Sequence, residues 1–299
     1  MSGGVCSLVA EVSYLTNVLR GFLMGSADIV PGVSGGTIAL LLGIYERLVH
    51  NLRTGAGVLG AVLRGRFGEV KERWQGIEWS FLLTLLAGIL IAIVTLARLL
   101  GDLLEDHPQA MAGLFFGLIA ASIAIAWGRV KEWTGSLQLI AAVAAIAAFL
   151  VLGLRSGDAG DPPALAFLAA GAVAIMAMIL PGISGSFILL MLGMYEAVLA
   201  AVNDRELFTL VVFAAGAVVG LAAFSTMLDR LLRHHHDLTM AVLIGVMIGS
   251  LRVLWPWPDG TDSAALGRPE DWAVPVLLAV AGALVITAIG RYAVRTTSD

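Results

Sequence analysis

Two short stretches of the sequence carry residues of a kind that binds anions. Residues 28–37 run Asp-Ile-Val-Pro-Gly-Val-Ser-Gly-Gly-Thr, and residues 181–186 run Pro-Gly-Ile-Ser-Gly-Ser. Proline removes a backbone donor and glycine tolerates angles that other residues avoid, so each stretch breaks a helix. Consecutive N–H groups at the start of the next helix, aided by its dipole and by hydroxyl groups, form an anion-binding concavity. The predicted ligands are Gly32, Ser34, Gly35, Gly36 and Thr37 in the first stretch and Gly182, Ser184, Gly185 and Ser186 in the second.

The second stretch repeats the first at a fixed offset. Pro31, Gly32, Ser34, Gly35, Gly43, Tyr45 and Glu46 reappear 150 residues later as Pro181, Gly182, Ser184, Gly185, Gly193, Tyr195 and Glu196. A simpler alternative is that each stretch only makes a tight hairpin, with glycines for close helix packing. Two copies that face each other from opposite sides favour anion binding over that alternative.

Two arginines are candidates for binding a phosphate head, because a guanidinium fork suits phosphate oxygens. Arg20 lies about two turns before Asp28 on the same predicted helix, and Arg252 lies near the end of another apolar segment. Neither has a charged counterpart in the other copy. For both, snorkelling of the side chain to the membrane interface is the alternative.

Three carboxylates are candidates for coupling transport to an ion, since ionisable groups inside a membrane usually mark function. Asp28 lies three residues before Pro31, whereas Glu46 and Glu196 follow tyrosines at the predicted ends of the outgoing helices. For the two glutamates, an ion pair with a neighbouring arginine or capping at the interface beside the tyrosine stays open.

The composition is that of a polytopic membrane protein. The 299 residues are 59% hydrophobic and 13% charged, with a mean hydropathy of +0.92, whereas a soluble domain has about 25% charged residues. The single cysteine, Cys6, excludes an internal disulfide framework. Nothing in the sequence indicates nucleic-acid binding, a metal site or a cofactor, and no catalytic or nucleotide-binding motif is present.

Apolar segments predict an all-α fold of two repeats. The segments are 12–27, 33–49, 79–100, 110–128, 137–154, 164–180, 183–202, 207–228, 238–255 and 273–293. Segments 79–128 and 207–255 align at a second offset of 128 residues, mainly through glycines. Spanning helices need about 20 apolar residues, so we interpret the shorter pairs 12–49 and 164–202 as re-entrant hairpins, each followed by three crossings. The predicted repeats are residues 1–154 and 155–299.

Basic residues predict the sidedness of the loops. Loops 47–78, 129–136, 229–237 and the C-terminal tail hold twelve basic residues, and the alternate loops hold three. This asymmetry places the first set and both termini in the cytoplasm. An odd number of crossings then inverts the second repeat relative to the first, as in many secondary transporters. The stretch 50–78 is predicted to be a cytoplasmic loop with an interfacial helical piece, or a plain topological anchor.

The motifs resemble the signature of a known family. Residues 21–37, Gly-Phe-Leu-Met-Gly-Ser-Ala-Asp-Ile-Val-Pro-Gly-Val-Ser-Gly-Gly-Thr, and 42–46, Leu-Gly-Ile-Tyr-Glu, look like those of bacterial and archaeal polyprenyl-phosphate (undecaprenyl-phosphate) transporters, formerly a domain of unknown function. Residues 180–186 and 192–196 fit the second half of the signature. The resemblance implies a plasma-membrane flippase, not an enzyme, that returns the carrier lipid of cell-wall synthesis to the inner leaflet. The site assignments rest on the physical argument.

Other functions are compatible with the same pattern. The main alternative is an ion-coupled secondary transporter of a small soluble anion, and a lipid phosphatase or a scaffold are the others. The expected partners are the polyprenyl-phosphate lipid and the bilayer, with coupling to protons or sodium and a homo-oligomer left open. The sequence predicts the phosphate head between the two Pro-Gly-x-Ser-Gly hairpin tips.

Overall fold

The computed structural model describes the backbone of residues 3–30, 33–154, 162–260 and 266–296, and its regular elements are α-helices, which confirms the all-α prediction. In chain order they are α1 (Gly3–Asp28), α2 (Gly35–Leu41), α3 (Tyr45–Leu63), α4 (Phe67–Gln75), α5 (Trp79–Asp106), α6 (Pro108–Trp127), α7 (Gly135–Val151), α8 (Ala164–Ile179), α9 (Gly185–Met191), α10 (Tyr195–Asn203), α11 (Leu207–His234), α12 (His236–Ser250) and α13 (Ala273–Thr296).

Four of these helices, α5, α6, α11 and α13, are long and apolar enough to cross a membrane. The predicted crossings 137–154 and 238–255 correspond to α7 and α12, which have only 17 and 15 residues. A helix of that length rises about 25 Å, less than a hydrocarbon core of about 30 Å. The first incoming segment, predicted as 12–27, is longer than expected, since α1 has 26 residues.

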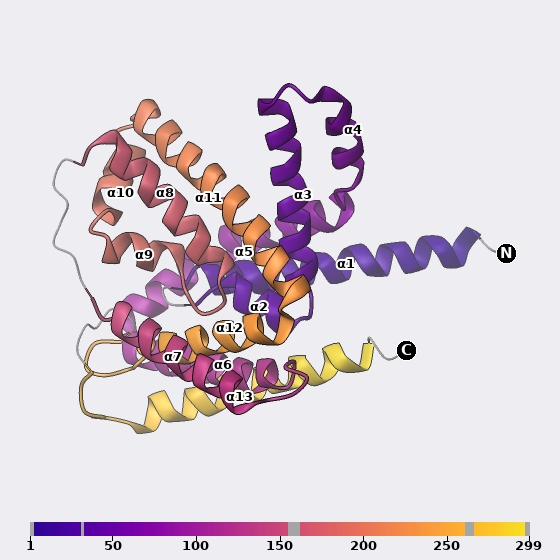
Figure 1. The fold of residues 1–299 in the computed structure, drawn as a ribbon. Coiled ribbons are helices and arrows are strands. Elements are labelled where there is room, and N and C mark those ends of the chain that lie inside the picture. The colour runs from indigo at the N-terminus through magenta and orange to yellow at the C-terminus, as the bar shows by residue number, and fades with distance from the viewer. Residues whose placement is uncertain (1–2, 31–32, 155–161, 261–265, 297–299) are drawn as a thin grey trace.

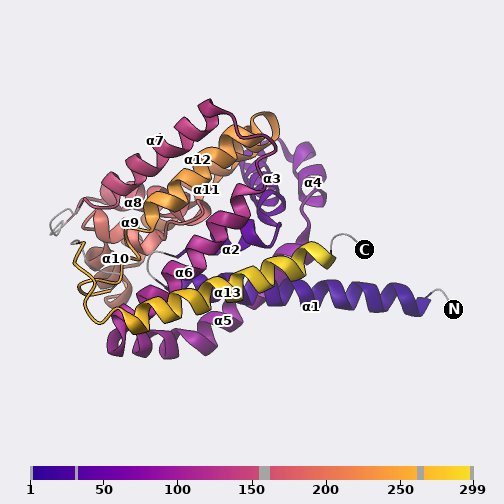
Figure 2. The ribbon, with the colours of Figure 1, turned by 90° about the horizontal axis from the view of Figure 1, so that it is seen from below.

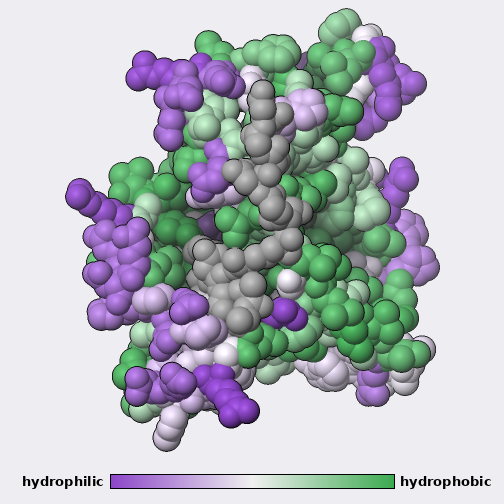
Figure 3. Space-filling model, turned by 90° about the vertical axis from the view of Figure 1, so that its left-hand side faces the viewer, coloured by the Kyte–Doolittle hydropathy of each residue, from purple (hydrophilic) through white to green (hydrophobic). Residues whose placement is uncertain are grey.

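The outer surfaces of the long helices are apolar. More than half of the surface is exposed in Leu90 and Val94 of α5, in Val211 of α11 and in Leu277 of α13. Figure 3 shows that hydrophobic residues cover much of one face of the molecule and that hydrophilic residues gather in separate groups. Such a surface indicates that lipid surrounds these helices, because soluble monomers rarely expose an apolar patch of this extent.

Close glycine contacts join the first helix of each half to the first long crossing. On α1 and α5, a Cβ added at Gly88 would lie 2.0 Å from the carbonyl oxygen of Val18. On α8 and α11, a Cβ added at Gly216 would lie 1.9 Å from the carbonyl oxygen of Leu168. The two pairs therefore pack in the same way, through small residues that let the backbones approach.

Four other helices pair across the two halves of the sequence. α6 packs along α13, and α7 packs along α12, as Figures 1 and 2 show. Gly117 of α6 lies against Ala279, and Gly245 of α12 lies against Ala141. Each half thus gives its last helix to the other half, and α12 lies at the centre, with Met240, Ile244 and Met247 nearly inaccessible to solvent.

The outgoing segments 33–49 and 183–202, predicted as single helices, are each broken by a sharp turn. α2 ends before Gly43 (φ 73°) and α9 ends before Gly193 (φ 67°), and α9 and α10 are bent by 110°. The N–H of Ile44 donates to Ala39 O (3.0 Å), and that of Met194 donates to Leu189 O (2.9 Å). This is the bonding of a helix C-terminus that closes on a left-handed glycine.

The stretch 50–78 is more ordered than predicted. α3 continues to Leu63, and α4 folds back beside it to form a helical hairpin that lies next to α11. α3 runs across the direction shared by α1 and α13 (Figure 1). The second half has only the nine-residue α10 at this place. The predicted boundary between residues 154 and 155 borders 155–161, which lie outside the described residues.

Candidate functional site

The first predicted tip is a turn between α1 and α2 in which Asp28 caps the second helix. The Oδ1 atom of Asp28 accepts a hydrogen bond from Gly35 N (2.6 Å), and Ser34 Oγ accepts one from Gly36 N (3.1 Å). A Cβ on Gly35 would lie 2.5 Å from Asp28 Oδ2, so only glycine fits beneath the carboxylate. Gly32 lies outside the described residues.

The second tip is a similar turn between α8 and α9, packed against the end of α12. Gly182 has φ 87°, and a Cβ there would lie 2.7 Å from Ser250 Oγ and 3.0 Å from the Cα of Met247. Ser184 and Ser186 hydroxyls lie 2.8 Å apart. Glycine is required at position 182 both by its left-handed backbone and by the lack of space.

The two tips touch each other inside the protein. Ser34 Oγ donates to Met178 O (3.1 Å), and Gly182 N donates to Thr37 Oγ1 (2.7 Å). Tyr45 Oη donates to Ile179 O (3.0 Å). The side chains of Ser34, Thr37 and Tyr45 lie in residues at most 1% exposed. The structure therefore brings together residues of the two copies that are more than 130 positions apart.

The expectation that the tip N–H groups are free is wrong for three of the predicted ligands. Gly35 N is bonded to Asp28, Gly36 N to Ser34 and Gly182 N to Thr37. A buried N–H group without a partner costs about 1–3 kcal/mol, and these three short polar side chains supply the acceptors. Ser184, Gly185 and Ser186 lie at the start of α9, where Ser186 alone is exposed.

The tips match in packing but differ in chemistry. A Cβ on Gly185 would lie 2.6 Å from Met178 Cγ, in the same relation that Gly35 has to Asp28. The carboxylate of the first tip is thus replaced by a thioether in the second. Thr37, which accepts from the second tip, has Phe187 as its counterpart.

The two predicted phosphate-binding arginines take no part in the hydrogen bonds between the tips. Arg20 Nη1 donates to Asn17 Oδ1 (3.1 Å) on the same helix, and Arg20 lies near Arg47. The guanidinium of Arg252 lies over the ring of Phe149 (4.6 Å to the centroid) and against Gly153. Among the described residues, neither arginine forms a hydrogen bond with a tip.

The predicted position of Glu46 and Glu196 is also corrected. Each lies in the first turn of a new helix, α3 or α10, because the chain breaks before it. Both are exposed, and Glu46 Oε1 lies 3.3 Å from His236 Nε2 at the start of α12. Tyr45 is not an interface anchor, because it is buried, whereas Tyr195 is 37% exposed.

Arg129 is a functional candidate that the sequence reasoning counted only as a topological charge. Its Nη2 donates to Leu41 O (3.0 Å), the last carbonyl of α2, and the guanidinium lies beside Gly43. Burial lowers the pKa of Arg129, and the nearby charge of Glu46 opposes this. A cation at a helix C-terminus stabilises the helix dipole. A prediction that α2 ends before Gly43 would have suggested a cation such as Arg129 at this helix end.

A second missed group lies at the far end of α11. Asp229 has only 4% of its side chain exposed and binds three cationic or titratable side chains from α3 and α11: Arg53, Arg233 (2.9 Å) and His50 (3.3 Å). A buried carboxylate needs such partners, because desolvation of an unpaired charge is costly. Asp229 directly follows the predicted apolar segment 207–228, so the sequence pattern assigns it to a loop.

Comparisons of the sequence with known proteins agree with the family that the motifs resemble. Residues 24–267 match a family described as undecaprenyl phosphate translocase-like. A polyprenyl-phosphate transporter from Vibrio cholerae is 37% identical, over 94% of this chain and 98% of the relative. A polyprenyl-phosphate transporter from Staphylococcus aureus is 33% identical, over 92% of this chain and 95% of the relative.

No solved structure matches the chain. The family and both relatives are named for transport and not for catalysis, as the sequence predicted. The matched residues include both Pro-Gly-x-Ser-Gly turns, and the relatives are matched over nearly their full length. The chain therefore belongs to the undecaprenyl phosphate translocase-like family of membrane transporters.

Proposed function

We propose that the protein carries undecaprenyl phosphate, or a closely related polyprenyl phosphate, from the outer to the inner leaflet of the plasma membrane. The observation that carries this proposal is the contact between the two buried turns, at Ser34, Thr37 and Gly182. A phosphate head must cross the hydrocarbon, and irregular backbone at membrane depth is tolerated where it lines a polar site. The names of both relatives support the substrate.

The phosphate head would bind by exchange with acceptors that the protein itself supplies. Asp28 holds Gly35 N, and Thr37 holds Gly182 N. A phosphate oxygen is a charged acceptor, as the Asp28 carboxylate is, and a stronger one than the neutral Thr37 hydroxyl, so separation of the two turns would offer these N–H groups to the lipid. Neutralisation or withdrawal of the Asp28 carboxylate is then the step at which a proton or sodium gradient would act.

Arg252 and Arg20 would bind the phosphate head before it reaches the two turns and after it leaves them. Arg252 follows Ser250 at one end of α12, and Arg20 lies near Arg47 at the end where His236 meets Glu46. An apolar cavity of about 240 Å³ lies beside the first turn, between α1, α5, α6 and α13, and would take part of the isoprenoid tail. With cytoplasmic termini, Arg252 faces the outer leaflet and Arg20 the inner one.

The test is transbilayer movement of a labelled polyprenyl phosphate in liposomes that contain the purified protein, with and without a pH gradient. We expect protein-dependent movement that falls at least tenfold in Asp28→Asn and in Ser34→Ala, because each change removes a charged or hydroxyl group at the contact. Ser136→Ala, at the exposed start of α7, is the matched control and keeps wild-type movement.

Two other results would replace the proposal. Release of inorganic phosphate from the lipid would make the protein a phosphatase. Entry of a soluble anion into the lumen, while the labelled lipid stays in its leaflet, would make it a secondary anion transporter with the same fold.

A further inference from the structure

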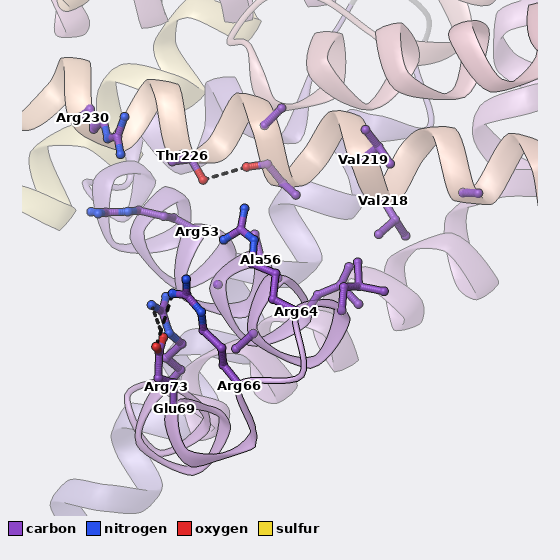
Figure 4. Close-up of a pocket in the computed structure, with 18 residues that line it drawn as sticks. Arg53, Ala56, Arg64, Arg66, Glu69, Arg73, Val218, Val219, Thr226 and Arg230 are labelled. Atoms are coloured by element: carbon purple, nitrogen blue, oxygen red, sulfur yellow. Dashed lines mark hydrogen bonds and ion pairs between the residues drawn. The ribbon is translucent and has the colours of Figure 1, made fainter.

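A second cavity, far larger than the one beside the first turn, lies between the α3–α4 hairpin and α11 (Figure 4). Its volume is about 920 Å³. One wall consists of small apolar residues of α11, and the other of α3 with the arginine-rich end of the hairpin. The lining residues include Ala215, Val218, Val219 and Ala222 on α11, Leu59 and Leu63 on α3, and, around the polar part, Arg53, Arg64, Arg66, Arg73, Glu69 and Arg230.

The polar part of this groove has an excess of positive charge. Five arginines line it against one carboxylate, Glu69, which binds Arg73 (2.9 Å) and lies 3.5 Å from Arg66. Arg64 and Arg230 form no ion pair with any of the described residues. Figure 4 shows the guanidinium ends of Arg53, Arg64 and Arg230 directed into the space beside α11. Arg53 is paired with Asp229, which is not among the lining residues, so Arg64 and Arg230 are the two arginines of the groove that can bind an added anion.

The groove has a fixed closed end and an open end. Asp229 of α11 binds Arg53 of α3, and this buried ion pair, with Arg233 and His50, holds the two helices together. From there α3 and α11 diverge (Figure 1). Among the residues of these two helices that line the groove, Leu63 of α3 and Ala215 of α11 lie farthest along each helix from this ion pair.

The hairpin has the character of a segment that lies at a membrane interface. Large apolar side chains of the hairpin are exposed beside its arginines: Leu63 (78%), Phe67 (71%) and Trp74 (52%). Helices with exposed apolar and basic residues settle at the boundary between head groups and acyl chains. α11 is long and apolar enough to cross the membrane, so the groove joins head-group depth to the hydrocarbon.

We propose that this groove holds the phosphate head of the transported polyprenyl phosphate at the cytoplasmic leaflet, with its tail along Val218 and Val219 of α11. The inference rests on the proposed function and adds a place for the lipid outside the two turns. A phosphate monoester carries a charge of about −1.5 to −2 at neutral pH and three acceptor oxygens, which suits several guanidinium forks better than the single charge of a phosphodiester lipid.

The absence of a matching hairpin in the second half gives the transporter two unequal sides. α10 has nine residues where α3 has nineteen, and α11 follows α10 after only three residues. A lipid site built by the hairpin therefore exists in one leaflet, where it would retain the head after it leaves the turns.

The experiment uses the full chain in nanodiscs and a polyprenyl phosphate with a fluorescent label and a diazirine in its tail. We expect the double variant Arg64→Ala/Arg230→Ala to bind the lipid about tenfold more weakly, because two charge-assisted hydrogen bonds are lost. Light should attach the tail to α11 near Val218 and Val219. The control is Lys71→Ala, because Lys71 lies on the same hairpin but does not line the groove. It removes one positive charge, as each arginine substitution does, and should bind the lipid as tightly as the wild type.

Four outcomes would overturn the inference: wild-type binding by the double variant, an equal loss in Lys71→Ala, labelling elsewhere than the groove, or equal competition by phosphatidylglycerol. The last would make the groove a site for a bulk anionic lipid. Arg64 and Arg230 are exposed, so the unfolding temperature of the double variant should stay unchanged. Transport in liposomes separates the two proposals. If the wild type moves the lipid but the double variant binds it normally, only the proposed groove site is wrong. If the wild type binds the lipid in the groove but moves none, only the proposed transport function is wrong.

Discussion

The first turn supplies side chains and the second supplies backbone where the two meet. Ser34, Thr37 and Tyr45 bind Met178 O, Gly182 N and Ile179 O. The contributions of the two turns differ because Thr37 has phenylalanine as its counterpart and because Tyr195, though identical to Tyr45, lies at the surface. Residue types could be matched from the sequence, but the partners of each donor depend on how the turns dock.

Replacement of Thr37 by valine tests the contact between the turns. Valine has the same shape but no acceptor, so Gly182 N would be left buried and unpaired. We expect a loss of about 1–3 kcal/mol in the free energy of unfolding, seen as a lower unfolding temperature in detergent. Thr95→Val is the control, because Thr95 is bonded to Ile91 O of its own exposed helix surface. Equal shifts in the two variants would show that the bond across the turns contributes nothing.

Helices could be predicted from the sequence where their apolar runs are long, and less well where they break. The long runs of α5, α11 and α13 were placed within a few residues, apart from polar ends such as Asp102–Asp106. The breaks after α2 and α9 were missed, although each carries a glycine followed two residues later by tyrosine and glutamate. A left-handed glycine that closes a helix competes with the apolar pattern that favours continuing it. The glycines and mixed charges of residues 50–78 favour a loop with one helical piece, whereas the structure has the end of α3 and all of α4 there.

Close helix crossings make Gly88 and Gly216 sensitive to substitution. A methyl group at either position would meet a backbone carbonyl at about 2 Å, so the helices must move apart. We expect Gly88→Ala and Gly216→Ala each to destabilise the protein by about 1–3 kcal/mol. Gly101→Ala, on the same helix as Gly88, has nothing within 4 Å and should be neutral or stabilising, since alanine favours a helix by about 1 kcal/mol. The measurement is the unfolding temperature of each variant in detergent. Similar shifts in all three variants would show that the close contacts at Gly88 and Gly216 do not determine stability.

The molecule as a whole is interlocked, because α6 packs with α13 and α7 with α12. The division into two repeats stays a prediction, and the exchange of helices between the halves leaves no trace in apolar periodicity. The inverted orientation of the two repeats remains a prediction that rests on the distribution of basic residues.

Cysteine labelling tests the orientation. On a Cys6→Ser background, which removes the single cysteine, Ser156→Cys should react with a membrane-impermeant maleimide from outside the cell. Ser136→Cys, at the start of α7, should react only after permeabilisation. The opposite pattern would invert the protein and move the arginine-rich groove to the outer leaflet.

The exchange of helices between the halves has a consequence for biosynthesis. A chain is made from its N-terminus, so α6 enters the membrane long before its main partner α13, which begins at Ala273. Until then the small residues of α6, such as Gly113 and Gly117, face lipid where they later face Pro275 and Ala279. The first half therefore cannot complete its own packing during synthesis, and a chain that stops before residue 273 lacks the helix that closes it.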